Sequence, residues 1–181
     1  TRELDNENLF LVMVTRNGTV KRLPVSTLKN IRASGIRALR MDEGDQLISV
    51  RETDGTRKIL IATHDGQAIC FDENDVRPMG REAAGVRGIK LREGDYVVGA
   101  GRAGGGTALL SVTQNGYGKR TQLAEYRVQA RGGKGIRAMA LSAKTGELVA
   151  LRMVRQDMDL LLISDDGTVI RMPVADVSVQ G

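Results

Sequence analysis

The segment that decides the fold is residues 58–72, which read Lys58-Ile-Leu-Ile-Ala-Thr-His-Asp-Gly-Gln-Ala-Ile-Cys-Phe-Asp72. Two runs rich in apolar and β-branched residues flank the Asp65-Gly66 pair, a pattern typical of a β-hairpin. An Asp-Gly or Asn-Gly pair supplies the positive backbone angles that a two-residue hairpin turn requires. We therefore predict two antiparallel strands, Lys58 to His64 and Gln67 to Asp72, joined by such a turn.

Copies of this hairpin recur along the chain. The equivalent turn pairs are Asn17-Gly18, Asn115-Gly116 and Asp166-Gly167, so the turn glycines are spaced by 48, 50 and 51 residues. A second series, Gly35, Gly85 and Gly135, is spaced by 50 and 50 residues. The acidic turns Glu43-Gly-Asp45 and Glu93-Gly-Asp95 form a third series with the same period. Markers that keep phase in this way indicate an array of structural repeats.

Each repeat is predicted to contain four short strands. In the second repeat, Val86 to Leu91 and Tyr96 to Gly101 follow the hairpin, after an exposed loop over Glu73 to Gly85. No segment has a sustained helical period, although Ser26 to Asn30 or Ala175 to Ser178 could form one helical turn. The prediction is an all-β, propeller-like array of four-stranded blades, with about three and a half blades present. One array spans residues 1–181, with approximate repeats 9–57, 58–106, 107–158 and a partial 159–181.

Composition limits the function classes. Apolar residues make up 41% of the 181 residues, enough for a packed core, and 27 Lys and Arg against 22 Asp and Glu give a net charge of +5. A strongly basic face therefore requires segregation of the two charge types. Cys70 is the only cysteine, which suits a reducing compartment, and the apolar runs are too short for a membrane helix. We expect a cytoplasmic protein with no membrane contact. Since the chain starts at Thr1 and ends in mid-repeat, we also expect it to be part of a longer one.

The most informative motif is Gln129-Ala-Arg-Gly-Gly-Lys-Gly135, which we call the box. It places two cations among three glycines. A loop with so few side chains lets backbone amides and basic groups approach a phosphate together. The box therefore indicates a site for phosphate groups.

Several phrases of the chain resemble the C-terminal domain of the A subunit of bacterial DNA gyrase, a β-pinwheel that wraps DNA. They are Arg16-Asn-Gly-Thr-Val-Lys-Arg22, Asp75-Val-Arg-Pro-Met-Gly80, Gly85-Val-Arg-Gly-Ile89, Asn115-Gly-Tyr-Gly-Lys-Arg120 and Glu125-Tyr-Arg-Val128. The family's box, Gln-Arg-Arg-Gly-Gly-Lys-Gly, matches here except at Ala130. Because the family's diagnostic box lies in its first blade, this copy resembles the weaker second copy found in later blades.

The resemblance implies a noncatalytic domain that bends duplex DNA around a basic rim and so directs supercoiling, associated with the nucleoid. It also implies a place within an ATP-dependent type IIA topoisomerase whose catalytic residues lie elsewhere. Its partners there would be the gyrase B subunit, together with the remainder of the gyrase A chain. The DNA-binding residues expected from the box are Gln129, Arg131, Gly132, Gly133, Lys134 and Gly135. Further expected contacts are Lys21, Arg22, Arg32, Arg37, Arg77, Arg81, Arg87, Lys119, Arg120, Arg127 and Arg137.

The same residues allow plainer interpretations. Cations on strands often face solvent beside acids, and the repeated glycines could serve close packing of strands. Topoisomerase IV has a related domain with a degenerate or absent box, so it is an alternative family. A propeller-like scaffold that binds a protein through its rim loops is an alternative of another class.

Other chemistry is not supported by the sequence. Gly99 to Gly104 matches a dinucleotide fingerprint but precedes a β-like segment where a helix is required, and Gly133-Lys134-Gly135 lacks the Ser or Thr of a triphosphate loop. Asp72 to Asp75 lacks the glycine and distal glutamate of a calcium loop. His64 and Cys70 are the only residues of their kinds, too few for zinc, and as neighbours across a hairpin they usually only pack. We expect no cofactor, no metal and no catalytic residue, Tyr96, Tyr117 and Tyr126 included.

Overall fold

The computed structural model describes residues 4–104 and 108–181. Among these residues it contains strands and short 3-10 helices and no α-helix, which confirms the all-β prediction. The strands are β1 Phe10–Thr15, β2 Thr19–Pro24, β3 Leu47–Thr53, β4 Lys58–Thr63, β5 Gln67–Asp72, β6 Val86–Arg87, β7 Val97–Ala103, β8 Ala108–Thr113, β9 Gly118–Gln122, β10 Ile136–Arg137, β11 Leu148–Val154, β12 Asp159–Ile163 and β13 Val169–Pro173. The 3-10 helices are η1 Val25–Leu28, η2 Glu73–Asp75, η3 Leu123–Glu125 and η4 Val174–Asp176.

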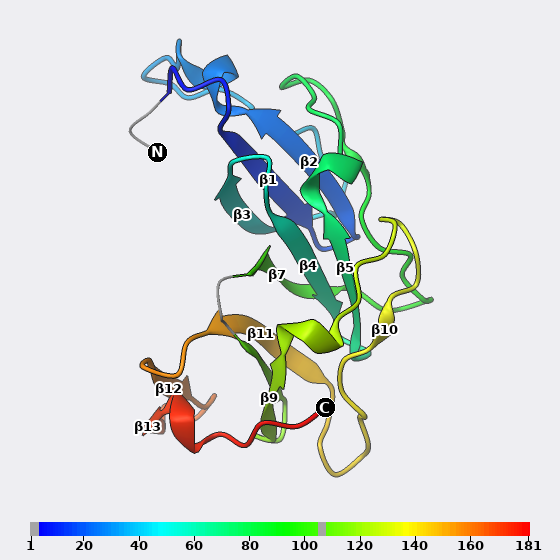
Figure 1. The fold of residues 1–181 in the computed structure, drawn as a ribbon, viewed down its shortest axis with the longest axis vertical. Coiled ribbons are helices and arrows are strands. Elements are labelled where there is room, and N and C mark those ends of the chain that lie inside the picture. The colour runs from blue at the N-terminus through cyan, green and yellow to red at the C-terminus, as the bar shows by residue number, and fades with distance from the viewer. Residues whose placement is uncertain (1–3, 105–107) are drawn as a thin grey trace.

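The strands form four antiparallel sheets, the blades, which follow one another from the top to the bottom of Figure 1. The first two have the strand orders β3-β1-β2-β6 and β10-β5-β4-β7, the third is β11-β8-β9, and the fourth is the hairpin β12-β13. The predicted division of the chain into repeats remains a prediction. Its boundary between residues 106 and 107 lies outside the described residues.

The third strand of a repeat does not join its own hairpin. Val86 to Leu91 was predicted as a full strand of the second blade, but only β6 forms, and it pairs with β2 of the preceding hairpin. β10 of the third repeat pairs in the same way with β5. Ile36 and Arg37, one period earlier, form no strand. The two short strands that do form, β6 and β10, both exchange backbone hydrogen bonds with the edge of the preceding hairpin.

The hairpin turns also differ from the prediction. Gly18, Gly66, Gly116 and Gly167 have positive φ, whereas no other residue type does among the described residues. In the second repeat Gly66 N donates to Thr63 O at 3.0 Å, and the paired strands resume with Ala62 opposite Ala68. The loop therefore has three residues between the two strands. Only the last of them, the glycine in the left-handed conformation, needs a positive φ.

The core lies between successive blades. Val12, Val14 and Val20 of the first hairpin pack against Ile61 and Phe71 of the second. The opposite face of the second hairpin contributes Leu60 and Cys70 to another cluster with the third blade. Burial on both faces explains why Lys58 to Phe71 reads as nearly continuous apolar runs instead of alternating.

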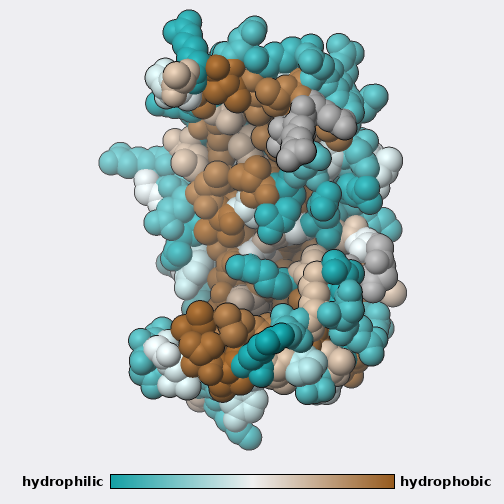
Figure 2. Space-filling view, turned by 90° about the vertical axis from the view of Figure 1, so that its left-hand side faces the viewer, coloured by the Kyte–Doolittle hydropathy of each residue, from teal (hydrophilic) through white to brown (hydrophobic). Residues whose placement is uncertain are grey.

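Two sides of the array differ. The loops that carry β6 and β10 lie at the right of Figure 1, which we call the rim, and β3, β7 and β11 lie toward the left, which we call the hub side. Figure 2 shows this left side, where apolar side chains gather in a vertical band between hydrophilic ones. Val50 of β3 and Val149 of β11 are among the exposed apolar residues of the hub strands.

Close approach of a rim loop to the preceding hairpin depends on Gly135, whose φ is +73° and whose added Cβ would lie 2.3 Å from Ala68 O. Gly35 has the same backbone conformation with no atom within 4 Å of its added Cβ. We expect Gly35→Ala to lower the free energy of unfolding by about 1–2 kcal/mol through backbone strain alone. Gly135→Ala should lower it by roughly 1–3 kcal/mol more through the clash. Urea unfolding curves of the two variants test this, and equal losses would contradict the inter-repeat contact.

Candidate nucleic-acid interface

The box lies on the rim and is held by backbone hydrogen bonds to the preceding repeat. Gln129 N donates to Cys70 O at 2.8 Å, and Gly132 N donates to Gly88 O at 2.7 Å. Lys90 N in turn donates to Gly133 O at 2.8 Å. The box is therefore a supported segment with a defined backbone, because both the second hairpin and the second rim loop bind it.

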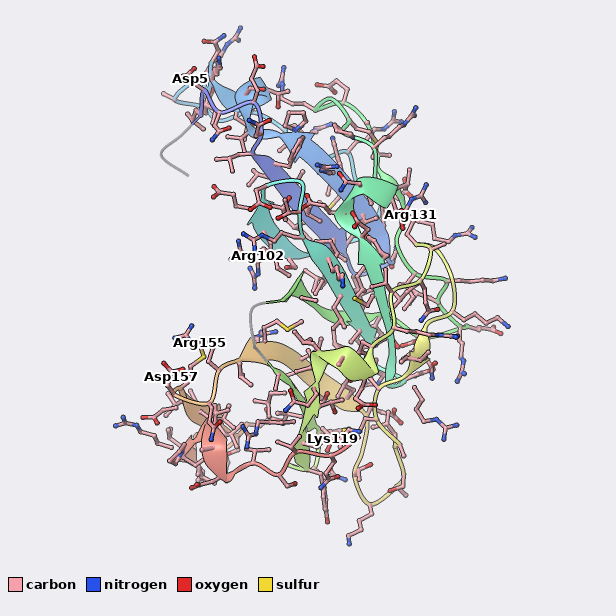
Figure 3. The ribbon with its side chains drawn as sticks, viewed as in Figure 1. Asp5, Arg102, Lys119, Arg131, Arg155 and Asp157 are labelled. Carbon is pink, nitrogen blue, oxygen red and sulfur yellow. The ribbon has the colours of Figure 1, made fainter. Side chains whose placement is uncertain are left out.

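The two cations of the box have different surroundings. Arg131 Nε donates to Asp75 O at 2.8 Å, and its Nη1 donates to Arg87 O at 3.1 Å. Arg131 is half-buried and clamps two rim loops together, at the right of Figure 3. Lys134 is exposed and takes part in none of the side-chain hydrogen bonds or ion pairs found in the described residues. Lys134 is thus the cation of the box that is free to meet an anion.

Other predicted cations follow the rim at the repeat period. Arg37, Arg87 and Arg137 are exposed and stand 50 residues apart. Arg87 lies in β6 and Arg137 in β10, whereas Arg37 lies in the loop between η1 and β3. None of them forms an ion pair within 4.0 Å among the described residues, where the five pairs involve Arg22, Lys29, Arg57, Arg155 and Arg171. The remaining predicted cations that are at least partly exposed are Arg32, Arg77, Arg81, Lys119 and Arg127. The rim therefore presents a periodic row of positive charges without paired carboxylates.

Lys119 has a backbone partner at the end of the chain. Its Nζ donates to Gly181 O at 3.2 Å, and it lies near the C-terminal residue in Figure 3. The ammonium keeps part of its hydrogen-bonding capacity for solvent, since the side chain is only half-buried.

Three predicted contacts need correction because their side chains are buried. Lys21 has no exposed surface, and its Nζ donates to Ala38 O, Arg81 O and Ala83 O at 2.7–2.9 Å. Desolvation by this burial lowers the pKa of Lys21 below its usual value, against the opposing charge of Glu82. No face of this ammonium remains for a phosphate.

Arg22 and Arg120 are held in the same way. Arg22 forms an ion pair with Glu73 at 3.3 Å, and its guanidinium lies 3.8 Å from the centre of the Phe10 ring. Arg120 donates to Val177 O at 2.7 Å and to Ala175 O at 3.0 Å. These side chains fasten one repeat to another segment of the array, so the structure does not support them as DNA contacts. The burial of Lys21 could have been expected from the sequence, because an apolar residue, Ile69, occupies the corresponding strand position of the second repeat.

His64 and Cys70 are accounted for by packing. The His64 ring stacks on Tyr96 with 4.5 Å between ring centres, and its Nδ1 lies 3.2 Å from Leu148 O. Cys70 is buried in the cluster between the second and third blades, and that burial raises the pKa of its thiol. A thiol with a raised pKa is a poor nucleophile at neutral pH. No helix in the described part of the chain has the length and hydropathy to cross a membrane.

Sequence reasoning missed one periodic series of cations. Arg51, Arg102 and Arg152 lie on β3, β7 and β11, the hub strands, 51 and 50 residues apart. Their period could have identified them. They lie away from the box, as Arg102 and Arg131 on opposite sides of Figure 3 illustrate.

Successive blades, of which the first two are completed at the outer edge by a strand of the next repeat, define a propeller-like β-array with a basic rim. The chain belongs to the DNA gyrase C-terminal domain family, a β-propeller family whose model matches residues 10–54, 57–103, 107–155 and 159–181. The match covers most of the chain, which confirms the resemblance found in the sequence.

Known proteins agree with this assignment. The chain is 51% identical over 177 residues to the DNA gyrase A protein of Clostridium acetobutylicum, covering 98% of the chain and 21% of that protein. It is 53% identical over 175 residues to the DNA gyrase A protein of Halalkalibacterium halodurans, covering 97% and 21%. The chain therefore spans about a fifth of the length of these relatives.

Two solved structures share the fold. One, described as the C-terminal domain of DNA topoisomerase IV, has a TM-score of 0.90 at 28% identity and covers 96% of this chain and 55% of that one. The other, described as the DNA gyrase A C-terminal domain, has a TM-score of 0.83 at 28% identity and covers 97% and 59%. The backbone alone thus fits both related domains, and the sequence relatives favour gyrase.

Burial of Lys21 predicts a structural role that an exposed lysine lacks. Lys21→Met removes the donor to three carbonyl oxygens and should lower the free energy of unfolding by about 1–3 kcal/mol. Lys134→Met, on an exposed side chain, should change it by less than about 0.5 kcal/mol. Chemical denaturation of both variants measures the difference. Equal effects would mean that the Lys21 hydrogen bonds contribute no net stability.

Proposed function

We propose that this chain is a noncatalytic DNA-binding domain that holds duplex DNA against its rim and bends it. The observation that carries the proposal is the periodic row Arg37, Arg87 and Arg137, exposed and without carboxylate partners among the described residues. Lys134 of the box adds a free cation to the same row. Similar charges at a regular step suit a curved duplex, since the phosphates of a bent helix return to a surface at regular intervals.

Distributed contacts are needed on energetic grounds. Smooth bending of a 20–30 bp site by 40–90° costs on the order of 1–6 kcal/mol. One exposed ion pair contributes about 0–1 kcal/mol and would not hold such a bend. Several cations on successive repeats, acting jointly, could hold such a bend. Binding of this kind is directed at phosphates, so it should be nearly independent of base sequence.

The preferred nucleic acid is a duplex. Single-strand binders stack bases on exposed aromatic side chains. Here Tyr126 is buried, and the ring of Tyr96 lies between His64 and the guanidinium of Arg16. Tyr117 is exposed, but a single ring is no platform for successive bases, whereas the described rim has a row of cations.

For the whole protein, we infer a type IIA topoisomerase of the gyrase kind, because the relatives are DNA gyrase A proteins. In it, the chain would deliver bent DNA to a strand-passage core, and the wrapping direction would bias supercoiling. The catalytic residues would lie outside residues 1–181. The partners would be the gyrase B subunit, together with the remainder of the gyrase A chain. ATP-dependent action and a place in the cytoplasm at the nucleoid follow from the same inference.

Two alternatives remain testable. The topoisomerase IV structure has the higher TM-score of the two compared, so a domain of that related enzyme is the second candidate. The residues match all of the family box except at Ala130, which favours gyrase. A scaffold that binds a protein partner through the acidic turns 43–45 and 93–95 would require no DNA affinity.

Removal of rim cations should reduce the salt dependence of DNA binding. We expect the triple variant Arg87→Gln, Lys134→Gln and Arg137→Gln to lower the slope of log affinity against log salt by about 0.9 per lost phosphate contact. Fluorescence anisotropy with a duplex of random sequence measures this slope. Arg102→Gln, on the other side of the molecule, is the matched control and should leave the slope unchanged. A parallel loss in both variants, or no duplex binding by the parent chain, would favour the scaffold.

Wrapping should also change the linking number of a plasmid that is closed while the protein is bound. We expect a nicked plasmid resealed in the presence of the chain to have an altered linking number, because a bent and wrapped path is fixed by ligation. Gel electrophoresis of the deproteinised plasmid resolves the topoisomers. An unchanged distribution at protein concentrations that saturate the DNA would show binding without wrapping.

A further inference from the structure

A second basic site lies on the hub side. A cavity of about 380 Å³ opens there among β3, β7 and β11. Five arginines line it: Arg51, Arg57, Arg102, Arg152 and Arg155. Arg102 and Arg155 are visible at the left of Figure 3, on the side away from Arg131. This cavity is separate from the rim row that the proposed DNA interface uses.

Three of these arginines have no carboxylate partner within 4.0 Å in the described residues. Arg51 Nη1 donates to Val50 O at 2.8 Å, Arg102 Nη1 to Glu52 O at 3.1 Å and Arg152 Nη1 to Leu151 O at 2.9 Å. These hydrogen bonds orient each guanidinium without neutralising it. Each head keeps further N–H donors, because a guanidinium has five.

The other two arginines are paired with acids. Arg57 forms an ion pair with Asp54 at 2.7 Å, and Arg155 pairs with Asp157 at 3.1 Å. A hydrogen bond from the Thr56 hydroxyl, with help from Thr56 N and Arg57, lowers the pKa of Asp54 to about 2, so this carboxylate is ionised at neutral pH. Five cations thus line the cavity, and two of them are offset by acids outside the lining, which leaves three unpaired positive charges.

The three unpaired arginines lie one on each hub strand. Hub strands approach one another closely where small residues face them: an added Cβ at Gly99 would lie 3.0 Å from Leu151 O. The Ser49 hydroxyl likewise bonds Ala100 O at 3.0 Å between β3 and β7. Arg51 and Arg152 pair with equivalent positions of their hairpins, Val12 and Leu110, whereas Arg102 pairs with Ile59, one position further along its strand. All three nevertheless line one opening. Leu151, Met153 and Met158 supply an apolar part of the wall.

We propose that this cavity binds an oligophosphate anion. Its volume falls within the roughly 300–1,000 Å³ of small-molecule sites, and guanidinium groups bind phosphate oxygens in a bidentate manner. Packed sheets lie about 10 Å apart, so arginines on successive blades suit an anion whose charges extend over several linked groups. An extended acidic peptide spreads its charges along a groove, whereas these cations surround one compact space.

The test is isothermal titration calorimetry of the 181-residue chain with inorganic tripolyphosphate at low ionic strength. We expect one site, and the double variant Arg102→Gln with Arg152→Gln should raise the dissociation constant by about tenfold or more, since two charge-assisted contacts are lost. Arg92→Gln is the control, because Arg92 is exposed and lies outside both the cavity lining and the proposed rim contacts, and it should leave the constant unchanged. Circular dichroism and thermal unfolding of each variant verify the fold.

Titrations with other anions identify which class of phosphate compound the cavity binds. Orthophosphate should bind more weakly than tripolyphosphate. A nucleoside triphosphate that binds more tightly than tripolyphosphate would identify a nucleotide as the occupant, and equal affinity would identify the phosphate chain itself. The proposal is overturned if a folded double variant keeps the parent affinity, if Arg92→Gln weakens binding equally, or if an oligoglutamate peptide binds more tightly than tripolyphosphate.

Discussion

Backbone hydrogen bonds between each hairpin and the rim loop of the next repeat are the interaction on which the rest of this structure depends. The turn glycine accepts from the following loop: Gly88 N donates to Gly18 O and Ala138 N to Gly66 O, both at 2.8 Å. The pairs β2-β6 and β5-β10 extend this contact along the outer edge of each blade. Since a hairpin alone leaves an edge of unpaired backbone groups, the next repeat completes it.

The pairing between each hairpin and the rim loop of the next repeat also explains the positions of the glycines. A loop that lies against a neighbouring strand needs a residue without a side chain where the two backbones meet, and Gly85 and Gly135 occupy such points against Val20 and Ala68. The repeat period in the sequence is therefore the period of contacts between neighbours. The first two blades are stable as members of the array, because the fourth strand of each comes from the next repeat.

The same contacts divide the arginines and lysines into three groups. Lys21, Arg22 and Arg120 are inside the joints between segments and stabilise them. Arg87 and Arg137 are carried outward by the loops that make those joints, and Arg37 is exposed one period earlier in the chain. Arg51, Arg102 and Arg152 lie on the hub strands and line the cavity there. A modest net charge of +5 thus yields separate positive surfaces, because burial and the repeat geometry segregate the charges.

The sequence by itself determined the repeat length, the all-β class, the hairpins and the family, because these depend on local pattern: apolar runs, turn glycines and their spacing. It also located the box and the rim arginines. Only the tertiary structure decided which blade receives β6 and β10, since strand pairing joins residues more than sixty positions apart. It likewise decided that Lys21 is buried while Lys134 is free, because exposure depends on the segments that pack against a side chain, and those segments come from other repeats.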